Sequence, residues 1–135
     1  MLDVRMWGRA LDRMPTLTES EWRALDPVAR WLIACRASVL FMTFTAAALG
    51  GLLAWRDGVF NWTLWLATAI GLLFAHATNN LLNDFTDSRR GIDKDNYYRN
   101  QYGVHVLEQG LVSIAEFWRY VAVTAGIALL LGGWL

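Results

Sequence analysis

The sequence predicts an all-α fold of three polytopic transmembrane helices with a cytoplasmic N-terminus. Hydrophobic residues make up 56% of the chain, and they are concentrated in three blocks without Asp, Glu, Lys or Arg, at residues 37–55, 62–82 and 120–135. A helix needs about 20 apolar residues to cross a bilayer, so the first two blocks are long enough. The third is shorter, and we interpret it as part of a span. Helices are expected because they satisfy their own backbone hydrogen bonds in lipid.

Basic residues are distributed unevenly around these blocks, and the asymmetry predicts an orientation. The first connection carries only Arg56, whereas the N-terminal segment and the second connection are rich in arginine and lysine. The positive-inside rule therefore places the N-terminus and the second connection in the cytoplasm, in a multi-pass protein of the cytoplasmic membrane. The residues on the predicted cytoplasmic side are Arg5, Arg9, Arg13, Arg23, Arg30, Arg36, Arg89, Arg90, Lys94, Arg99 and Arg119.

The chain divides into a cytoplasmic amphipathic segment, residues 1–27, and a membrane region, residues 28–135. In the first segment Thr18-x-x-Glu21 is a capping box, which predicts a short helix that Pro27 then disturbs. We expect membrane helices over residues 28–55 and 61–88 and from residue 113 onward, with a cytoplasmic loop over residues 89–112.

The charge and cysteine content exclude two classes of protein. The formal net charge is zero and no basic patch is present, so nothing predicts binding to nucleic acid. Cys35 is the single cysteine, which excludes an internal disulfide.

A stripe of polar residues at the end of the second block forms the candidate site. On a helix with 3.6 residues per turn, it contains His76, Asn80, Asn83, Asp84 and Asp87. An aspartate at the centre of a membrane helix costs roughly 2.5–3.5 kcal/mol by insertion scales. We therefore expect the two carboxylates to bind a cation or a charged ligand.

Asp84 and Asp87 are the candidate metal ligands and catalytic residues, with the carboxamide of Asn83 or Asn80 as neutral support. These are hard oxygen ligands with no cysteine nearby, so the expected ion is Mg²⁺, or Mn²⁺, and not zinc. Mg²⁺ usually binds one or two carboxylates together with substrate phosphates, and the site therefore predicts a phosphate-bearing ligand. The residues expected to neutralise further phosphate charge are Arg89, Arg90 and Lys94.

Other interpretations of these residues stay open. The stripe can join helices through interhelical hydrogen bonds without a ligand, and Asp84 and Asp87 can be helix-end residues exposed to water. Arg36 can face a phosphate or extend its side chain to the membrane interface. For His76, we favour an interior hydrogen-bonding role over that of a catalytic base.

Residues 79–93 resemble the first Asp-rich motif of the UbiA superfamily of intramembrane prenyltransferases. They are most similar to the branch that includes 1,4-dihydroxy-2-naphthoate prenyltransferases. Residues 109–113 resemble that branch's loop motif, and Arg36 resembles the family's arginine before the first helix. The matching motif is Asn83-Asp84-x-x-Asp87-x-x-x-Gly91-x-Asp93; the departures are Ala37 and Val104-His105, where the family usually has Pro and Pro-Arg.

The resemblance implies Mg²⁺-dependent transfer of an isoprenyl group from an isoprenyl diphosphate to an aromatic acceptor, in quinone or menaquinone-type biosynthesis. It implies that Asp84, Asp87 and Asn83 hold the metal, and that the substrate-binding residues are Asn80, Asn83, Arg36, Arg89, Arg90 and Lys94.

The family is a larger helical bundle with a second Asp-rich motif, so the chain resembles only its N-terminal third to half. A missing C-terminal half or a partner chain is expected to complete the site. The alternatives are a non-catalytic three-helix membrane subunit or anchor and, as a third class, a component of cation transport.

Overall fold

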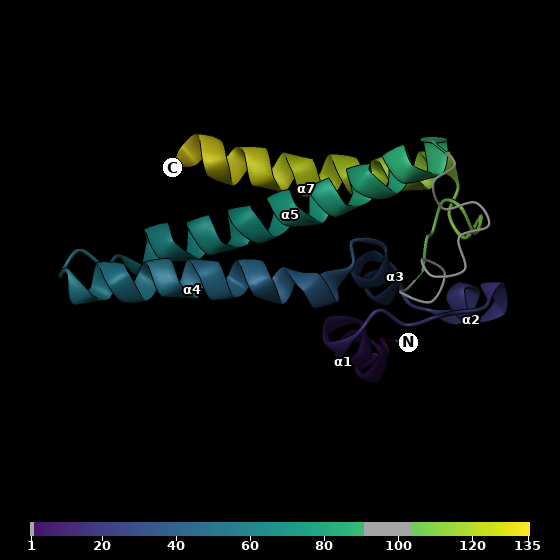
Figure 1. Cartoon of the computed structure of the whole chain (residues 1–135), viewed down its shortest axis with the longest axis horizontal. Coiled ribbons are helices and arrows are strands. Elements are labelled where there is room, and N and C mark those ends of the chain that lie inside the picture. The colour runs from purple at the N-terminus through teal and green to yellow at the C-terminus, as the bar shows by residue number, and fades with distance from the viewer. Residues whose placement is uncertain (1, 91–103) are drawn as a thin grey trace.

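The computed structural model of the chain describes residues 2–90 and 104–135, and these residues form helices and connecting segments without a strand. Three long helices run along the molecule: α4 (Leu40–Arg56), α5 (Trp62–Arg90) and α7 (Ile114–Trp134). α5 packs against both α4 and α7, and the shorter helices gather at one end (Figure 1). The described part of the chain therefore confirms the predicted all-helical class.

Two of these segments are long and apolar enough to cross a membrane, namely Ala37–Arg56, which contains α4, and α7. In their most apolar stretches only 22% and 17% of the residues are buried inside the molecule, which leaves wide apolar surfaces. α5 has 29 residues and spans about 43 Å, but His76, Asn79 and Asn80 interrupt its apolar stretch. The third span and the cytoplasmic N-terminus remain predictions.

The N-terminal segment contains more regular structure than its sequence indicated: α1 (Val4–Asp12), α2 (Glu19–Ala24) and α3 (Pro27–Ala34). The predicted capping box is confirmed, because the Thr18 hydroxyl accepts from the Glu21 amide and the Glu21 carboxylate accepts from the Thr18 amide. Pro27 was expected to disturb the short helix, but it does not lie in that helix. It begins α3, where the missing N–H is not needed, and Asp26 caps that helix.

The expected continuous helix over residues 28–55 is wrong, because the chain turns between α3 and α4. α3 ends at Ala34, and the 3₁₀ turn η1 (Ala37–Val39) leads into α4. Arg36 lies at the turn in the left-handed conformation, with φ 54° and ψ 54°. That conformation costs a residue with a Cβ roughly 1–2 kcal/mol, so its contacts must hold it there. Neither glycine nor proline marks the break, which is why the sequence pattern did not predict it.

The buried core lies at the end of the bundle that carries the short helices. Its largest buried side chains include Trp22 of α2, Leu81 of α5 and Phe117 of α7, together with Val106 from the segment over residues 104–112. The other halves of α4 and α7 leave most of their large apolar side chains exposed. Packing therefore fixes the geometry most firmly at the end where the predicted polar residues of α5 lie.

At the opposite end, α4 and α5 approach each other closely at Gly51. The indole Nε1 of Trp65 donates to the backbone carbonyl of Ala47 at 2.9 Å. The same indole ring occupies the space that a Cβ on Gly51 would need. Small residues at such crossings let membrane helices approach, so Gly51 is required by this contact.

We expect Gly51→Ala to destabilise the protein by about 1–3 kcal/mol, because the added methyl group displaces the Trp65 ring from its hydrogen bond. Gly50→Ala is the matched control: its Cβ would meet nothing within 4 Å, and alanine favours the helix. Unfolding of the two variants in detergent, followed by circular dichroism, measures the difference. Equal stability of both variants would contradict the contact.

Candidate functional site

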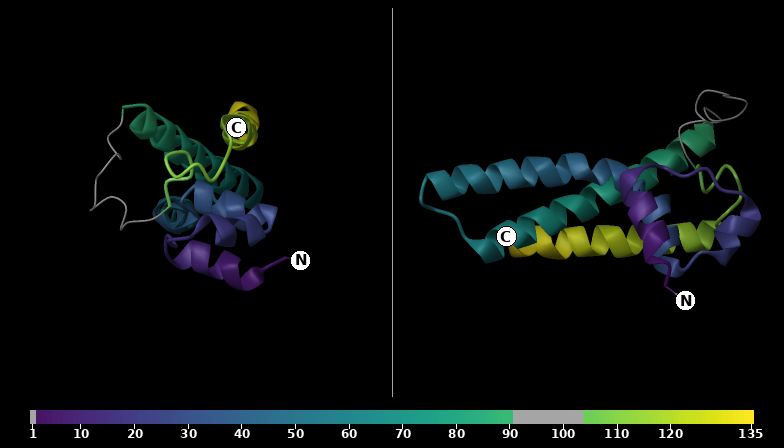
Figure 2. Two further views of the ribbon diagram at one scale, coloured as in Figure 1. Left: turned by 90° about the vertical axis from the view of Figure 1, so that its right-hand side faces the viewer. Right: turned by 90° about the horizontal axis from the view of Figure 1, so that it is seen from below.

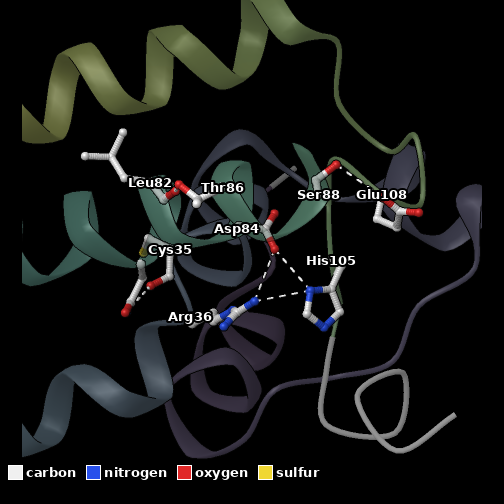
Figure 3. Close-up of polar contacts among 9 residues, drawn as sticks. Cys35, Arg36, Leu82, Asp84, Thr86, Ser88, His105 and Glu108 are labelled. Carbon is white, nitrogen blue, oxygen red and sulfur yellow. Dashed lines mark hydrogen bonds and ion pairs between the residues drawn. The ribbon is translucent and has the colours of Figure 1, made fainter. Parts of the chain in front are cut away.

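Asp84 lies at the centre of a buried polar cluster formed by α5, the turn before α4 and the segment over residues 104–112 (Figure 3). Its side chain is 3% exposed, and Oδ1 accepts a hydrogen bond from Nη2 of Arg36 at 3.1 Å; the Arg36 side chain is 24% exposed. Asp84 is removed from water and Arg36 only partly so, and the loss of Arg36 would leave the buried carboxylate uncompensated.

His105 is the third member of the cluster. Its Nδ1 lies 3.1 Å from Oδ1 of Asp84 and 3.2 Å from Nη2 of Arg36. Arginine only donates and an ionised carboxylate only accepts. Nδ1 therefore accepts from Arg36 when it carries no proton and donates to Asp84 when it does. Either tautomer leaves the cluster connected.

Packing of the segment over residues 104–112 places His105 against α5. Val104 and Val106 on either side of it are buried in the core. The Ser88 hydroxyl, near the end of α5, donates to the Glu108 carboxylate at 3.2 Å. The sequence predicted no role for His105. The apolar residues on both sides of it, within an otherwise charged connection, could have indicated that this segment is buried.

Asn80 positions the backbone next to Arg36. It is buried one turn before Asp84, and its Nδ2 donates to the carbonyl oxygen of Cys35 at 3.0 Å. α5 therefore holds the turn at two adjacent points, through the backbone of Cys35 and the guanidinium of Arg36. These two contacts explain how the left-handed conformation of Arg36 is maintained.

The second carboxylate oxygen of Asp84, Oδ2, is buried and has no hydrogen-bond partner within residues 2–90 and 104–135. A buried carboxylate oxygen without a partner is costly, and it is a suitable ligand for a cation. The described residues contain no group of three or more His, Cys, Asp or Glu side chains arranged to hold a metal. The unpartnered Oδ2 of Asp84 fits an ion that takes one or two carboxylates from a protein and its other ligands from water or phosphate.

The other predicted site residues are more dispersed. Asp87 is half-buried, three residues beyond Asp84, whereas Asn83 is exposed at the edge of the stripe, about 100° around the helix from Asp84. The guanidinium of Arg89 lies over the Phe85 ring at 5.3 Å and is not a member of the cluster. Arg90 is exposed at the end of α5, and Lys94 lies outside the described residues.

His76 lies further along the same helix and outside this cluster. Its Nδ1 and the hydroxyl of Thr43 on α4 are 2.6 Å apart. The contact is an interhelical hydrogen bond between α4 and α5, which agrees with the interior role expected for this histidine.

The chain is similar to known proteins. Residues 40–135 match the UbiA prenyltransferase family. The chain belongs to this family. It is similar to UbiA prenyltransferase domain-containing protein 1 of Rattus norvegicus, with 36% identity over 83 residues, and to that of Homo sapiens, with 34% identity over 83 residues. Each match covers 61% of this chain and 23% of the relative. No solved structure matches the chain.

Membership of the UbiA family confirms the resemblance found in residues 79–93, and it accounts for the apolar surfaces of α4 and α7. Proteins of this family are integral membrane proteins, and two apolar helices of sufficient length are present here. The chain spans less than a quarter of the length of the curated relatives that it matches.

We expect Arg36→Gln to destabilise this UbiA-family chain by about 3–5 kcal/mol, because it leaves the buried Asp84 carboxylate without its cation. The matched control is Arg56→Gln, whose partner Asp57 is exposed, so that this pair contributes only about 0–1 kcal/mol. Unfolding in detergent measures both. Arg36→Gly should lose roughly 1–2 kcal/mol less than Arg36→Gln, because glycine relieves the left-handed strain. Wild-type stability of Arg36→Gln would disprove the pairing.

We expect the thiol of Cys35 to resist modification in the folded protein. Burial raises its pKa to about 12, so the reactive thiolate is scarce even at mildly alkaline pH. Maleimide labelling followed by mass spectrometry should leave the folded chain unmodified and label it after denaturation. The exposed control Ser20→Cys should react in the folded chain, and equally fast reaction of Cys35 would contradict its burial.

Proposed function

We propose that the chain forms the first diphosphate-binding half of an Mg²⁺-dependent prenyltransferase site. The complete enzyme would transfer an isoprenyl group from an isoprenyl diphosphate to an aromatic acceptor in quinone or menaquinone-type biosynthesis. The observation that carries the proposal is the buried Oδ2 of Asp84, which has no partner among the described residues and lies three residues from Asp87. Family membership supports the reaction class.

In this proposal Asp84 and Asp87 hold the metal, with Asn83 supporting from the adjacent exposed face. The bound ion would supply positive charge to the diphosphate as it leaves. Arg36 holds Oδ1 of Asp84 and so keeps Oδ2 directed away from the pair. Asn80 is a positioning residue, because its contact with Cys35 fixes the backbone beside Arg36.

The remaining proposed contacts use the basic residues around the end of α5. Arg89, Arg90 and Lys94 would bind the outer oxygens of the diphosphate, since arginine and lysine both bind phosphate strongly. During transfer, the bond between the isoprenyl carbon and the diphosphate oxygen breaks and a carbon–carbon bond to the acceptor ring forms, with loss of a ring proton. Apolar helix surfaces would exclude water from the allylic cation.

The site would lie on the cytoplasmic side of the membrane, where the positive-inside rule places the short helices and the end of α5. A complementary half, from a partner chain or from further sequence, would supply the second set of acidic residues. The partial coverage of the curated relatives supports this need.

Binding of radiolabelled geranylgeranyl diphosphate to the purified chain in detergent, with Mg²⁺ or with EDTA, tests the proposal. We expect binding to require Mg²⁺ and to weaken in Asp84→Asn and in Asp87→Asn by at least the roughly 10–100-fold that loss of an outer-shell partner costs at other metal sites. Asp57→Asn is the control, because Asp57 lies exposed at the opposite end of α4.

Two outcomes would contradict the proposed function. Binding that persists in EDTA would exclude the metal, and equal binding by all three variants would exclude the acidic residues of α5. Absence of binding, or binding by Asp84→Asn and Asp87→Asn as strong as that by Asp57→Asn, with the variants folded by circular dichroism, would favour the alternative of a non-catalytic membrane subunit or anchor.

A further inference from the structure

α1 is held against the rest of the molecule by its buried face and by hydrogen bonds to the Asp26 carboxylate. Ala10 is buried, and Trp7 is half-buried with its Nε1 3.1 Å from both carboxylate oxygens of Asp26. The amide of Asp3 donates to the same carboxylate at 3.1 Å. Burial by itself would raise the pKa of Asp26, but the N–H donors of Asp3, Ala29, Trp7 and Val28 outweigh burial and lower it. Asp26 therefore stays ionised at neutral pH, and the orientation of α1 is set.

The rest of the α1 surface divides into two exposed faces of different chemistry. Val4 and Leu11 are 67% and 55% exposed, and lie about 20° apart around the helix. Arg5 and Arg9 are exposed about one turn apart on the neighbouring face. Neither arginine has a hydrogen-bond or ion-pair partner within residues 2–90 and 104–135. Two like charges at this spacing disfavour a helix unless an anion binds them.

α1 lies transverse to α4, beside the end at which α4 begins (Figure 2). Leu11 lines a cavity of about 340 Å³ together with Leu40, Phe41 and Phe44 at the start of α4. The apolar face of α1 is therefore continuous with an apolar side of α4 that is exposed in a membrane-spanning segment. A transverse amphipathic helix at the end of a span lies where the bilayer surface would be.

We propose that α1 is an interfacial helix that binds the surface of an anionic bilayer. Val4 and Leu11 enter the boundary of the acyl chains, and Arg5 and Arg9 bind lipid phosphate groups. A guanidinium forms paired hydrogen bonds with phosphate oxygens, so two exposed arginines beside an apolar face, without partners in the part of the chain that the structure describes, are suited to anionic headgroups. None of these four residues is among those assigned to diphosphate binding, and the binding of α1 to a bilayer does not require catalysis.

Spin labels in the full chain reconstituted into nanodiscs test this orientation. Val4→Cys and Leu11→Cys carry the label on the apolar face, and Arg13→Cys carries it at the exposed C-cap of α1 while keeping Arg5 and Arg9. Buried Cys35 serves as the unlabelled background. In bilayers of phosphatidylcholine with phosphatidylglycerol, we expect the first two labels to be accessible to oxygen at a depth of roughly 5–10 Å and the third to a water-soluble nickel chelate.

The charge arm of the experiment uses Arg5→Gln/Arg9→Gln, with Arg23→Gln as the control, because Arg23 is exposed but already paired with Glu19. The double variant should lose label depth in the anionic bilayer, and the control should not. Equal access of the nickel chelate to all three labels would disprove immersion. Depth that is the same in pure phosphatidylcholine and unchanged by the double variant would disprove the binding of anionic headgroups.

Discussion

The ion pair between Arg36 and Asp84 determines the geometry of the functional end of the molecule. It connects residues 48 positions apart, one at a turn between helices and one on α5. The turn is strained at Arg36, and the contact of Asn80 with Cys35 holds it from the adjacent position. The chain turns between α3 and α4 although no glycine or proline lies there. The ion pair stabilises this turn, because it holds Arg36 against α5.

Interhelical hydrogen bonds also connect α5 to its neighbours further along the helix. It bonds to α4 through Trp65 and Ala47, and to α7 through the hydroxyls of Thr78 and Thr124 at 2.9 Å. Lipid chains are as apolar as the helix surfaces, so burial gives little drive for helices to associate within a bilayer. We therefore expect the close approach at Gly51 and these hydrogen bonds to hold the long helices together. The short helices are held by a buried hydrophobic core like that of a soluble protein.

The sequence predicted the elements that obey local rules. The capping box at Thr18, the extent of α5 to within two residues at its end and the start of α7 after Ser113 follow from apolar runs and capping residues. It did not predict the break at Arg36 or the contact with His105, because both depend on partners far away in the chain. For the candidate site, the periodicity of α5 grouped Asn80 and Asn83 with Asp84. It could not show which edge of that stripe packs against the rest of the molecule, and Asn83 lies on the exposed edge.

The two carboxylate oxygens of Asp84 have different surroundings in the proposed metal site. Arg36 and His105 both contact Oδ1 of Asp84, which leaves Oδ2 as the atom available to a cation. Asp84 would then coordinate through one oxygen only, and the ion would need Asp87, water and phosphate for its other ligands. In the absence of any ligand, Arg36 already compensates one buried negative charge. The buried carboxylate of Asp84 is therefore compensated in the protein alone, and the proposed metal is not needed to balance its charge.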